Sequence, residues 1–376
     1  MKKKIISIFA SLLFISTVVG QHSIVLTNPL GNDRTDEMVE VNALKLKTNF
    51  KSKSYILKND KNEEIAYQLC YNNKKKIQSL IFQATVKANS STTYTLTIGK
   101  PAPIKPKTVA RFVPERKDDL AWENDLAAYR MYGPALAKEN PSNGSDLWLK
   151  RTDELIVDKF YHDELKNGLS YHVDHGQGLD CYSVGHTLGA GGIAPFALDS
   201  LWIGNHYDSY KIIENGPLRS VFSLIYDSVK VGTQFYKQTI TITSNAGSIL
   251  NKAVLKFTGS PQKMELAAGI FLHDGKGQLQ QNTANGTEAY AEDATSIANV
   301  PSGRNYVGVF VPVQINKAIR KDKHGLLLTN YLVGNTFTYY FGGGWSKWHF
   351  PSDESWFIAV NQFAECIKNP LKISIR

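Results

Sequence analysis

The chain has 376 residues, with 43 lysines and arginines against 34 aspartates and glutamates, and a formal net charge of +9. Its basic residues are scattered, and no zinc-finger, RNA-recognition or helix-turn-helix pattern occurs, which excludes a nucleic-acid-binding module. The length suffices for one large core or two unequal ones, and the many tyrosines, phenylalanines, valines and threonines favour strands.

The N-terminus predicts a secretory signal over residues 1–20. Three lysines at 2–4 precede an apolar run at 5–19, and Gly20 supplies a small residue near the expected cleavage point. The run is too short for a membrane span, so we expect none after the signal is removed. We expect an exported protein, periplasmic or secreted. Removing three lysines from a charge of +9 leaves +6, which suits acidic polysaccharide partners.

Residues 21–100 form the N-terminal sheet portion of the predicted fold. Their short alternating runs are separated by Asn, Asp, Gly or Lys clusters, as is typical of antiparallel sheets. A proline-rich stretch at 100–107 predicts an extended connector. The strands expected before it are 23–26, 40–46, 65–69, 79–86 and 94–98.

Strand patterns return along the rest of the chain. Residues 155–161 fit a strand or a helix equally well, and turn signals at 245–247 and 285–286 mark hairpins. We predict a mainly β protein, with a single domain at 21–376 built as one large antiparallel β-sandwich. The later strands are expected at 146–150, 218–231, 234–243, 253–258, 264–271, 307–314, 337–341 and 355–359.

The residues Trp122, Glu123, Asn124 and Asp125 form the first cluster with chemical potential. On a strand, Glu123 and Asp125 would point to the same side, and adjacent carboxylates raise the pKa of one of them. That arrangement suits acid–base catalysis, whereas a turn explains the same residues equally well. Arg130 follows, and its guanidinium could bind a substrate carboxylate in bidentate fashion.

The second cluster is the glycine-rich segment at 171–192. It combines six glycines with three of the nine histidines of the chain. Glycine at this density disfavours a helix or a plain strand and lets a ligand approach the backbone closely. His172, His175 and Tyr182 are the candidate proton-transfer groups of this segment. A tight corner whose polar groups satisfy one another is the alternative.

A metal site is a second interpretation of the same histidines. His172 and His175, with Asp180 or His206, would supply the three protein ligands that catalytic zinc usually takes. The His-Glu-x-x-His helix pattern is absent, and Gly176 interrupts the helical face that this pattern needs. We therefore predict no metal, with a divalent ion as the alternative. Three widely spaced cysteines, Cys70, Cys181 and Cys366, give neither a disulfide framework nor a zinc ribbon; one bridge, or a nucleophilic Cys181, stays open.

Further candidate binding residues lie downstream. Arg219, at the start of an expected strand, is a second anion clamp or a surface charge, and His206 lies shortly before it. The glycine-rich segment 342–349 contains Trp345 and His349, and aromatic rings suit the flat faces of sugars. A buried structural tryptophan is the alternative. No nucleophile elbow, Walker loop or dinucleotide fingerprint occurs, so no organic cofactor is indicated.

Three motifs resemble a secreted Bacteroidetes family known only as a domain of unknown function. They are Trp-Glu-Asn-Asp-x-x-Ala-Tyr-Arg-x-Tyr-Gly-Pro-Ala at 122–135, His-x-Asp-His-Gly-x-Gly-Leu-Asp at 172–180 with its continuation to 192, and Asn-Gly-Pro-Leu-Arg at 215–219. The resemblance extends to the ulvan oligosaccharide dehydratases. It implies a galactose-mutarotase-like supersandwich and a carbon–oxygen lyase that converts a terminal uronate into its 4,5-unsaturated form.

Such an elimination needs a cation to neutralise the carboxylate, a base for the C5 proton and an acid for the departing hydroxyl. The candidates are Arg130 or Arg219 with Asn124 for the carboxylate, and His172 or His175 with Tyr182 for base and acid in either order. A chain-cleaving polysaccharide lyase, a glycoside hydrolase using Glu123 or Asp125, and a non-catalytic carbohydrate-binding protein are the alternatives.

Overall fold

The structure is a computed structural model that describes residues 22–376 except 47, 140, 261 and 296–298. It confirms the predicted fold class, because the chain is mainly β and its ladders are antiparallel. The signal predicted at 1–20 lies outside the described residues. Among the described residues, no helix has the length and apolar character needed to cross a membrane.

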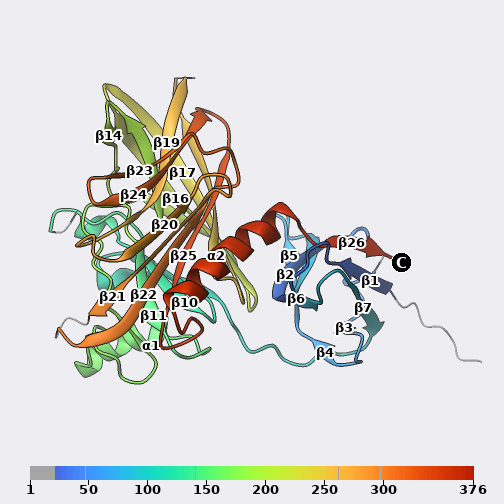
Figure 1. Ribbon diagram of the computed structural model, residues 1–376. Coiled ribbons are helices and arrows are strands. Elements are labelled where there is room, and N and C mark those ends of the chain that lie inside the picture. The colour runs from blue at the N-terminus through green and yellow to red at the C-terminus, as the bar shows by residue number, and fades with distance from the viewer. Residues whose placement is uncertain (1–21, 47, 140, 261, 296–298) are drawn as a thin grey trace, which may run out of the picture.

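A small sandwich stands apart from the rest of the chain in Figure 1. The sequence predicts residues 21–100 to be one sheet portion of a single large sandwich. Instead, residues 22–98 and the last strand enclose a separate core, which includes Leu26, Leu57, Phe82 and Leu96. Its first sheet has the order β26 (Lys372–Ile375), β1 (His22–Thr27), β7 (Ser91–Ile98), β3 (Tyr55–Lys58) and β4 (Glu64–Ile65). Its second sheet has the order β2 (Arg34–Asn42), β6 (Ile77–Val86) and β5 (Tyr67–Tyr71).

The large sandwich has one eight-stranded sheet that faces two five-stranded sheets. This arrangement is consistent with the supersandwich that the family resemblance implies. The eight strands, in order, are β15 (Ser209–Asn215), β16 (Arg219–Val231), β17 (Gln234–Asn245), β18 (Asn251–Thr258), β25 (Phe337–Trp345), β22 (Pro301–Phe310), β21 (Thr287–Thr295) and β20 (Gln278–Asn282). The first five-stranded sheet runs β12 (Gly178–Asp180), β11 (Asp146–Lys150), β10 (Ala127–Met131), β9 (Asp119–Glu123) and β8 (Val109–Val113). The second runs β14 (Ser200–Leu201), β13 (Gly192–Ala197), β19 (Lys263–Phe271), β24 (His324–Leu332) and β23 (Lys317–Lys321).

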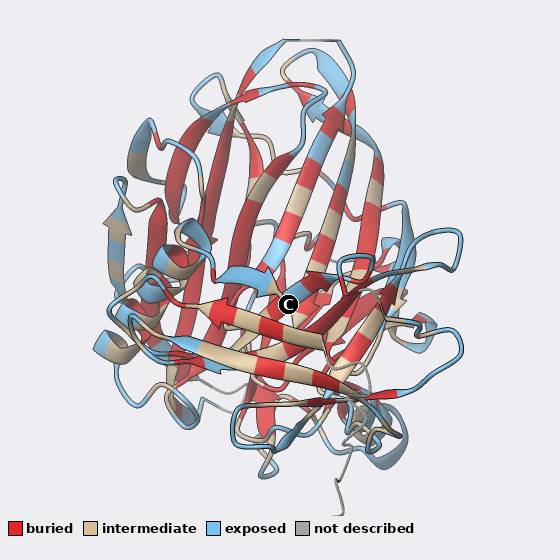
Figure 2. Ribbon diagram, turned by 90° about the vertical axis from the view of Figure 1, so that its right-hand side faces the viewer, coloured by how far each residue is buried: buried red, intermediate tan, exposed pale blue. Residues whose placement is uncertain are grey.

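One hydrophobic core joins the three sheets of the large sandwich. It takes Leu120 and Leu149 from the first five-stranded sheet, Leu266 from the second and Phe222 and Phe341 from the eight-stranded sheet. The strands alternate buried and exposed side chains, as the banding in Figure 2 shows, because successive side chains of a strand point to opposite faces. The alternating pattern read from the sequence therefore predicted the strands well.

Helices cover the outer faces of two sheets. Helix α1 (Val157–His162), continued by the π-type turn Asp163–Asn167, packs Phe160 and Tyr161 against Trp148 of β11. Helix α2 (Asp353–Lys368) covers β21 and β22 and runs toward the small sandwich (Figure 1). Two single 3-10 turns lie at Pro114–Arg116 and Pro134–Leu136.

The strand expected at 355–359 is wrong, because these residues belong to α2. Ser352 caps the helix in a reciprocal capping box with Ser355, and Trp356, Val360 and Ala364 follow one another on its buried face. Spacing of three and four residues is helical, whereas the short window suggested a strand. Most of the ambiguous run at 155–161 is helical, because it overlaps helix α1 at residues 157–161.

Candidate active site

Glu123 is held inside the protein by the start of α1. Its Oε2 lies 2.8 Å from Lys150 Nζ and accepts a hydrogen bond from the Ile156 amide at 2.9 Å, while Oε1 accepts one from the Val157 amide at 2.8 Å. Both members of the ion pair are fully buried. A carboxylate at a helix N-terminus satisfies amides that have no partner within the helix. Glu123 therefore stabilises this corner and does not face a substrate.

The neighbours of Glu123 also support the fold. Asn124 makes an Asx turn by accepting from the Leu126 amide at 2.9 Å, and its amide donates to two backbone carbonyls of the β17–β18 turn. Asp125 accepts from the Gly247 amide of the same turn at 2.7 Å. Trp122 is buried in the core, and its indole donates to Asn251 Oδ1 at 3.1 Å.

Arg130 is buried and fully engaged by protein groups. Its Nη2 lies 2.6 Å from Asp146 Oδ2 and 2.8 Å from Asp180 Oδ2, and its guanidinium stacks on the ring of Trp148. Burial, together with Asp146, raises the pKa of Asp180 well above its usual range despite the nearby Arg130. Because both carboxylates already hold Arg130, it is not free to bind a substrate carboxylate.

The structure joins the two predicted clusters through Asp180. His172 Nδ1 lies 2.9 Å from the Asp180 carbonyl oxygen and 3.6 Å from Asp180 Oδ2, so His172 and Arg130 share this residue. His175 is exposed, and its Nε2 lies 3.0 Å from the Ser170 carbonyl. These contacts fasten the loop that precedes β12, and neither histidine lines the cleft described below.

The other predicted binding residues are scattered. Arg219 pairs with Glu214 and Glu40 where the large sandwich meets the small one. Trp345 is buried and donates to the Ser302 carbonyl at 2.6 Å, and His349 is exposed in the loop after β25. His206 is buried next to the pocket treated further below, and its Nε2 makes no hydrogen bond within the described part of the chain. The structure does not bring these four side chains together.

The zinc ligand set considered from the sequence is not assembled. In the described part of the chain, no three His, Cys, Asp or Glu side chains come together in a way that could hold a metal ion. His172 and His175 bind backbone carbonyls instead.

A different group of polar residues lines a cleft of about 420 Å³, which we call the His273 cleft. It lies between the end of β12, the turn after β19, and strands β21 and β22. Its volume falls in the range of small-ligand sites. Its polar lining includes Ser183, His273, Lys276, Glu292, Arg304 and Asn305.

His273 and Glu292 form the central pair of this cleft. His273 Nδ1 lies 2.7 Å from Glu292 Oε1, and Nε2 lies 2.8 Å from the Ser183 carbonyl. Burial disfavours the charged imidazole, but the hydrogen bond and charge of Glu292 and the Ser183 carbonyl outweigh it, so the pKa of His273 is raised. His273 also has a positive φ of 44°, a conformation uncommon outside glycine. The histidine is thus held in one orientation.

Asn305 holds Glu292, the carboxylate member of the pair, in place. It is buried, and its Nδ2 donates to Glu292 Oε1 at 3.1 Å, the same oxygen that faces His273. Its Oδ1 is buried and has no hydrogen-bond partner within the described residues. The amide orientation follows from chemistry, because the opposite one would set a carbonyl oxygen against the Glu292 carboxylate.

Tyr182 packs behind the pair. Its ring meets that of His273 edge-on at 4.7 Å, and its hydroxyl donates to the Phe271 carbonyl at 3.4 Å. Burial raises the pKa of this hydroxyl well above its usual range, so Tyr182 stays protonated. Of the predicted catalytic residues, it is the one that contacts the central pair of the cleft.

Two cations, Lys276 and Arg304, line the cleft together with the carboxylates of Asp274, Glu292 and Asp293. Arg304 is paired with Asp353 and Asp293, at 2.7 Å each. Lys276 is largely exposed, with its Nζ 3.3 Å from Asp274. Lys276 has one carboxylate partner and Arg304 has two, so Lys276 is the cation that can more easily leave its partner to bind an incoming anion.

Comparison with known proteins shows the family of this chain. A protein family described as "Domain of unknown function (DUF4861)" matches residues 26–373. The chain belongs to this family. It is similar to "Uncharacterized protein P7" of Formosa agariphila, with 32% identity over 279 residues, which are 71% of this chain and 69% of that protein. The resemblance of the sequence motifs to a family known only as a domain of unknown function is confirmed, and its extension to the ulvan oligosaccharide dehydratases stays a prediction.

Two solved structures are similar to the chain. One is described as a protein in the glycosyl hydrolase family 38 from Enterococcus faecalis, with a TM-score of 0.50, 10% identity and coverage of 95% of this chain. The other is an alpha-mannosidase from Enterococcus faecalis V583, with a TM-score of 0.46, 10% identity and the same coverage of this chain. The chain spans about half of each, 47% and 46%. At this identity the first likeness shows a fold, the β-sandwich, and no activity.

Sequence reasoning missed His273, Glu292 and Asn305. A signal existed for Glu292, since it is a charged residue that directly follows the buried run Ala289 to Ala291. His273 lies two residues after β19, before a turn with the sequence Asp-Gly-Lys-Gly, where the end of a strand can present a side chain. Nothing in the spacing links the three residues, because His273 follows β19 whereas Glu292 and Asn305 come from β21 and β22.

Proposed function

We propose that this member of the family is a carbon–oxygen lyase that dehydrates the terminal uronate of acidic oligosaccharides, with the His273 cleft as its active site. The observation that carries the proposal is the His273–Glu292 pair in a cleft of about 420 Å³ that two cations also line. A histidine oriented by a carboxylate is a common arrangement for proton transfer. The fold shared with a glycosyl hydrolase family 38 protein supports a carbohydrate substrate.

The proposed reaction uses His273 for both proton transfers. The uronate carboxylate pairs with Lys276, which makes the C5 proton more acidic. Neutral His273 leaves the Ser183 carbonyl and takes the C5 proton through Nε2, and Glu292 stabilises the resulting imidazolium. The C4–O bond breaks as the C4=C5 double bond forms, and His273 returns the same proton to the departing oxygen. One water leaves, and all atoms and electrons balance.

This scheme reassigns the roles proposed from the sequence. Arg130 is engaged by Asp146 and Asp180, so Lys276 or Arg304 replaces it as the carboxylate partner. His273 replaces His172 and His175 as base and acid. Tyr182 packs on His273 and acts as a positioning residue. The export predicted from the N-terminus fits an extracellular or periplasmic polysaccharide as the source of the substrate.

The proposal is tested by incubating the pure protein with saturated uronate-ended oligosaccharides from ulvan, pectin and glycosaminoglycans. A lyase produces the ultraviolet absorption of the conjugated C4=C5 double bond. We expect the band with at least one substrate and its loss by about 10²-fold or more in His273→Ala. His162→Ala, on the exposed end of α1, is the matched control. No band with any of the three substrates contradicts the proposal.

A non-catalytic carbohydrate-binding protein is the second candidate. It is favoured by one observation: both ring nitrogens of His273 already face acceptors, Glu292 and Ser183, as in a purely structural histidine. A binder would show oligosaccharide affinity without turnover, and His273→Ala would keep that affinity. Calorimetric titration beside the absorption assay separates the two functions.

A further inference from the structure

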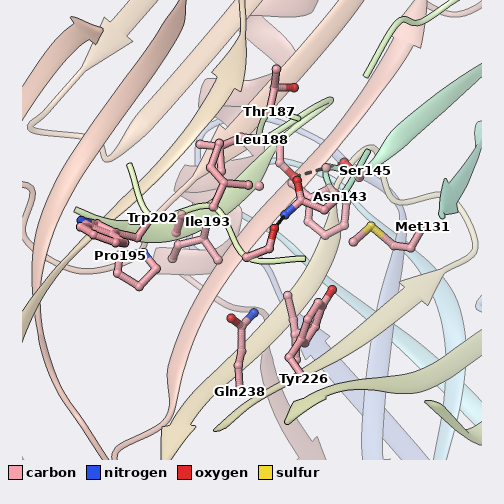
Figure 3. A pocket seen from close by; sticks show the side chains of 18 of the residues that line it. Met131, Asn143, Ser145, Thr187, Leu188, Ile193, Pro195, Trp202, Tyr226 and Gln238 are labelled. Atoms are coloured by element: carbon pink, nitrogen blue, oxygen red, sulfur yellow. Dashed lines mark hydrogen bonds between the residues drawn. The ribbon is translucent and has the colours of Figure 1, made fainter. Parts of the chain in front are cut away.

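A second pocket lies inside the large sandwich. It is located between the two five-stranded sheets and the inner face of the eight-stranded sheet. Figure 3 shows it between the glycine-rich segment at 187–192, the segment around Trp202 and strands β16 and β17. Its volume is about 60 Å³. That space admits a hydroxymethyl group or two neighbouring hydroxyls, and it is too narrow for a whole sugar ring.

The lining of this pocket carries no charge. Among the described residues that line it there is no Asp, Glu, Lys, Arg or His, whereas the His273 cleft has all five types. Its polar groups are amides and hydroxyls set among apolar side chains: Asn143, Ser145, Thr187, Asn205, Tyr226, Gln238 and Tyr339. A site without charge offers nothing to pair with an ion, so an anionic or cationic ligand would lose its solvation there without compensation.

One polar atom of this lining, Asn143 Oδ1, is buried without a hydrogen-bond partner within the described residues. The side chains of Tyr226 and Tyr339, which are 7% and 2% exposed, and the half-buried Gln238 line the same pocket. Asn143 donates from Nδ2 to the Gly204 carbonyl, which fixes its amide. In Figure 3, Tyr226 and Gln238 extend toward Asn143. Native proteins satisfy nearly all buried polar groups, so the unpartnered Asn143 Oδ1, in a pocket that two tyrosines also line, indicates a ligand that can donate and accept hydrogen bonds.

The chemistry of the ligand follows from these groups. Burial raises the pKa of both tyrosine hydroxyls, so each keeps its proton and can donate to a ligand oxygen or accept from its hydroxyl. Asn143 Oδ1 accepts only. Trp202 lies at one side of the pocket with its indole held by the Ala197 carbonyl at 2.9 Å, and an indole face suits the C–H face of a sugar.

We propose that this pocket binds the hydroxyl-bearing edge of a neutral carbohydrate residue, with the sugar ring resting against Trp202. The site is separate from the His273 cleft, and the proposal stands whether or not the protein is a lyase. It adds a neutral-sugar subsite to a protein whose proposed substrate is acidic.

The test is calorimetric titration of the full-length mature protein with xylobiose, cellobiose and mannobiose as neutral probes. We expect saturable binding of at least one of them. Tyr226→Phe removes one hydroxyl and keeps the ring, so it should weaken that binding by about 2- to 10-fold, the value of one hydrogen bond. Gln238→Leu should act in the same direction, and Tyr71→Phe, an exposed tyrosine of the small sandwich, should have no effect.

His273→Ala separates this proposal from the proposed function. It should keep the neutral-sugar affinity even where it abolishes dehydration, and neutral-sugar binding without any dehydration supports this pocket and contradicts the lyase. Absence of binding for all three probes, which would leave ordered water as the occupant, overturns the proposal. Equal affinities in the parent, Tyr226→Phe and Gln238→Leu proteins also overturn it.

Discussion

His273 Nδ1 lies 2.7 Å from Glu292 Oε1, although Glu292 belongs to the eight-stranded sheet and His273 lies in the turn after a strand of another sheet. His273 follows β19, and Glu292 lies in β21. The pair thus forms only when the sandwich closes, and it faces a cleft that also contains Ser183 from the glycine-rich segment. The proposed acid–base chemistry depends on this relationship.

The pH dependence of the proposed reaction should reflect this pair. His273 must be neutral to take a proton, and its folded pKa is raised above the ordinary value of 6.5. The ratio kcat/KM should therefore rise with pH through an inflection above 6.5. In Glu292→Gln the charge that raises the pKa of His273 is gone, so the inflection should move to lower pH. An inflection unchanged in Glu292→Gln would show that another group titrates.

Glu288 should make the fold less stable in alkaline solution. It is fully buried, and burial raises its pKa from 4.5 to about 8 against the hydrogen bonds from Gln281 and the Ile270 amide. The folded state therefore holds this proton more tightly, so the stabilisation is complete below pH 4.5 and is lost as the pH rises to 8. The loss amounts to about 1.4 kcal/mol for each pH unit between the two pKa values.

This prediction is checked by urea unfolding at pH 5 and pH 9. Glu288→Gln keeps the shape and removes the titration, so its unfolding free energy should change less between the two pH values than that of the parent protein. Glu63→Gln, at an exposed position, is the control and should behave like the parent. Identical pH dependence of the parent and Glu288→Gln would refute the assignment.

The buried pair of Lys150 and Glu123 should be essential for stability. Lys150→Met leaves the Glu123 carboxylate buried, with only the two amides at the start of α1 as partners. Removing one partner of a buried ion pair costs about 3–5 kcal/mol. Lys105→Met breaks the exposed pair with Glu154 and should leave the stability nearly unchanged, because solvent screens exposed charges. Thermal unfolding of the two variants measures the contrast, and similar losses would contradict it.

The sequence predicted the fold class well and the site poorly, for physical reasons. Alternation of buried and exposed side chains is a local signal, so strands such as β17 and β18 could be recognised. The motif at 122–130 is rich in charged residues, but the fold buries them in structural ion pairs, as Glu123 and Arg130 show. Charge alone does not distinguish a site from a buried network.

The cleft could not be found from spacing. The cleft combines residues that are far apart in the sequence: Ser183, His273, Glu292 and Asn305. Strands β21 and β22 pair with each other, whereas β19 belongs to another sheet. The sequence does not specify which strands become neighbours, so it could not place these residues together. Helix α2 was missed for a similar reason, because a five-residue window cannot separate helical from strand periodicity.

The product mass of a uronate-ended oligosaccharide tests the central claim most directly. The protein and its His273→Ala and His162→Ala variants are incubated with the same substrate, and the products are analysed by mass spectrometry. We predict a product lighter by one water, with unchanged chain length, from the parent and His162→Ala, and about 10²-fold less of it from His273→Ala. A shortened oligosaccharide, or full dehydration by His273→Ala, would contradict the account.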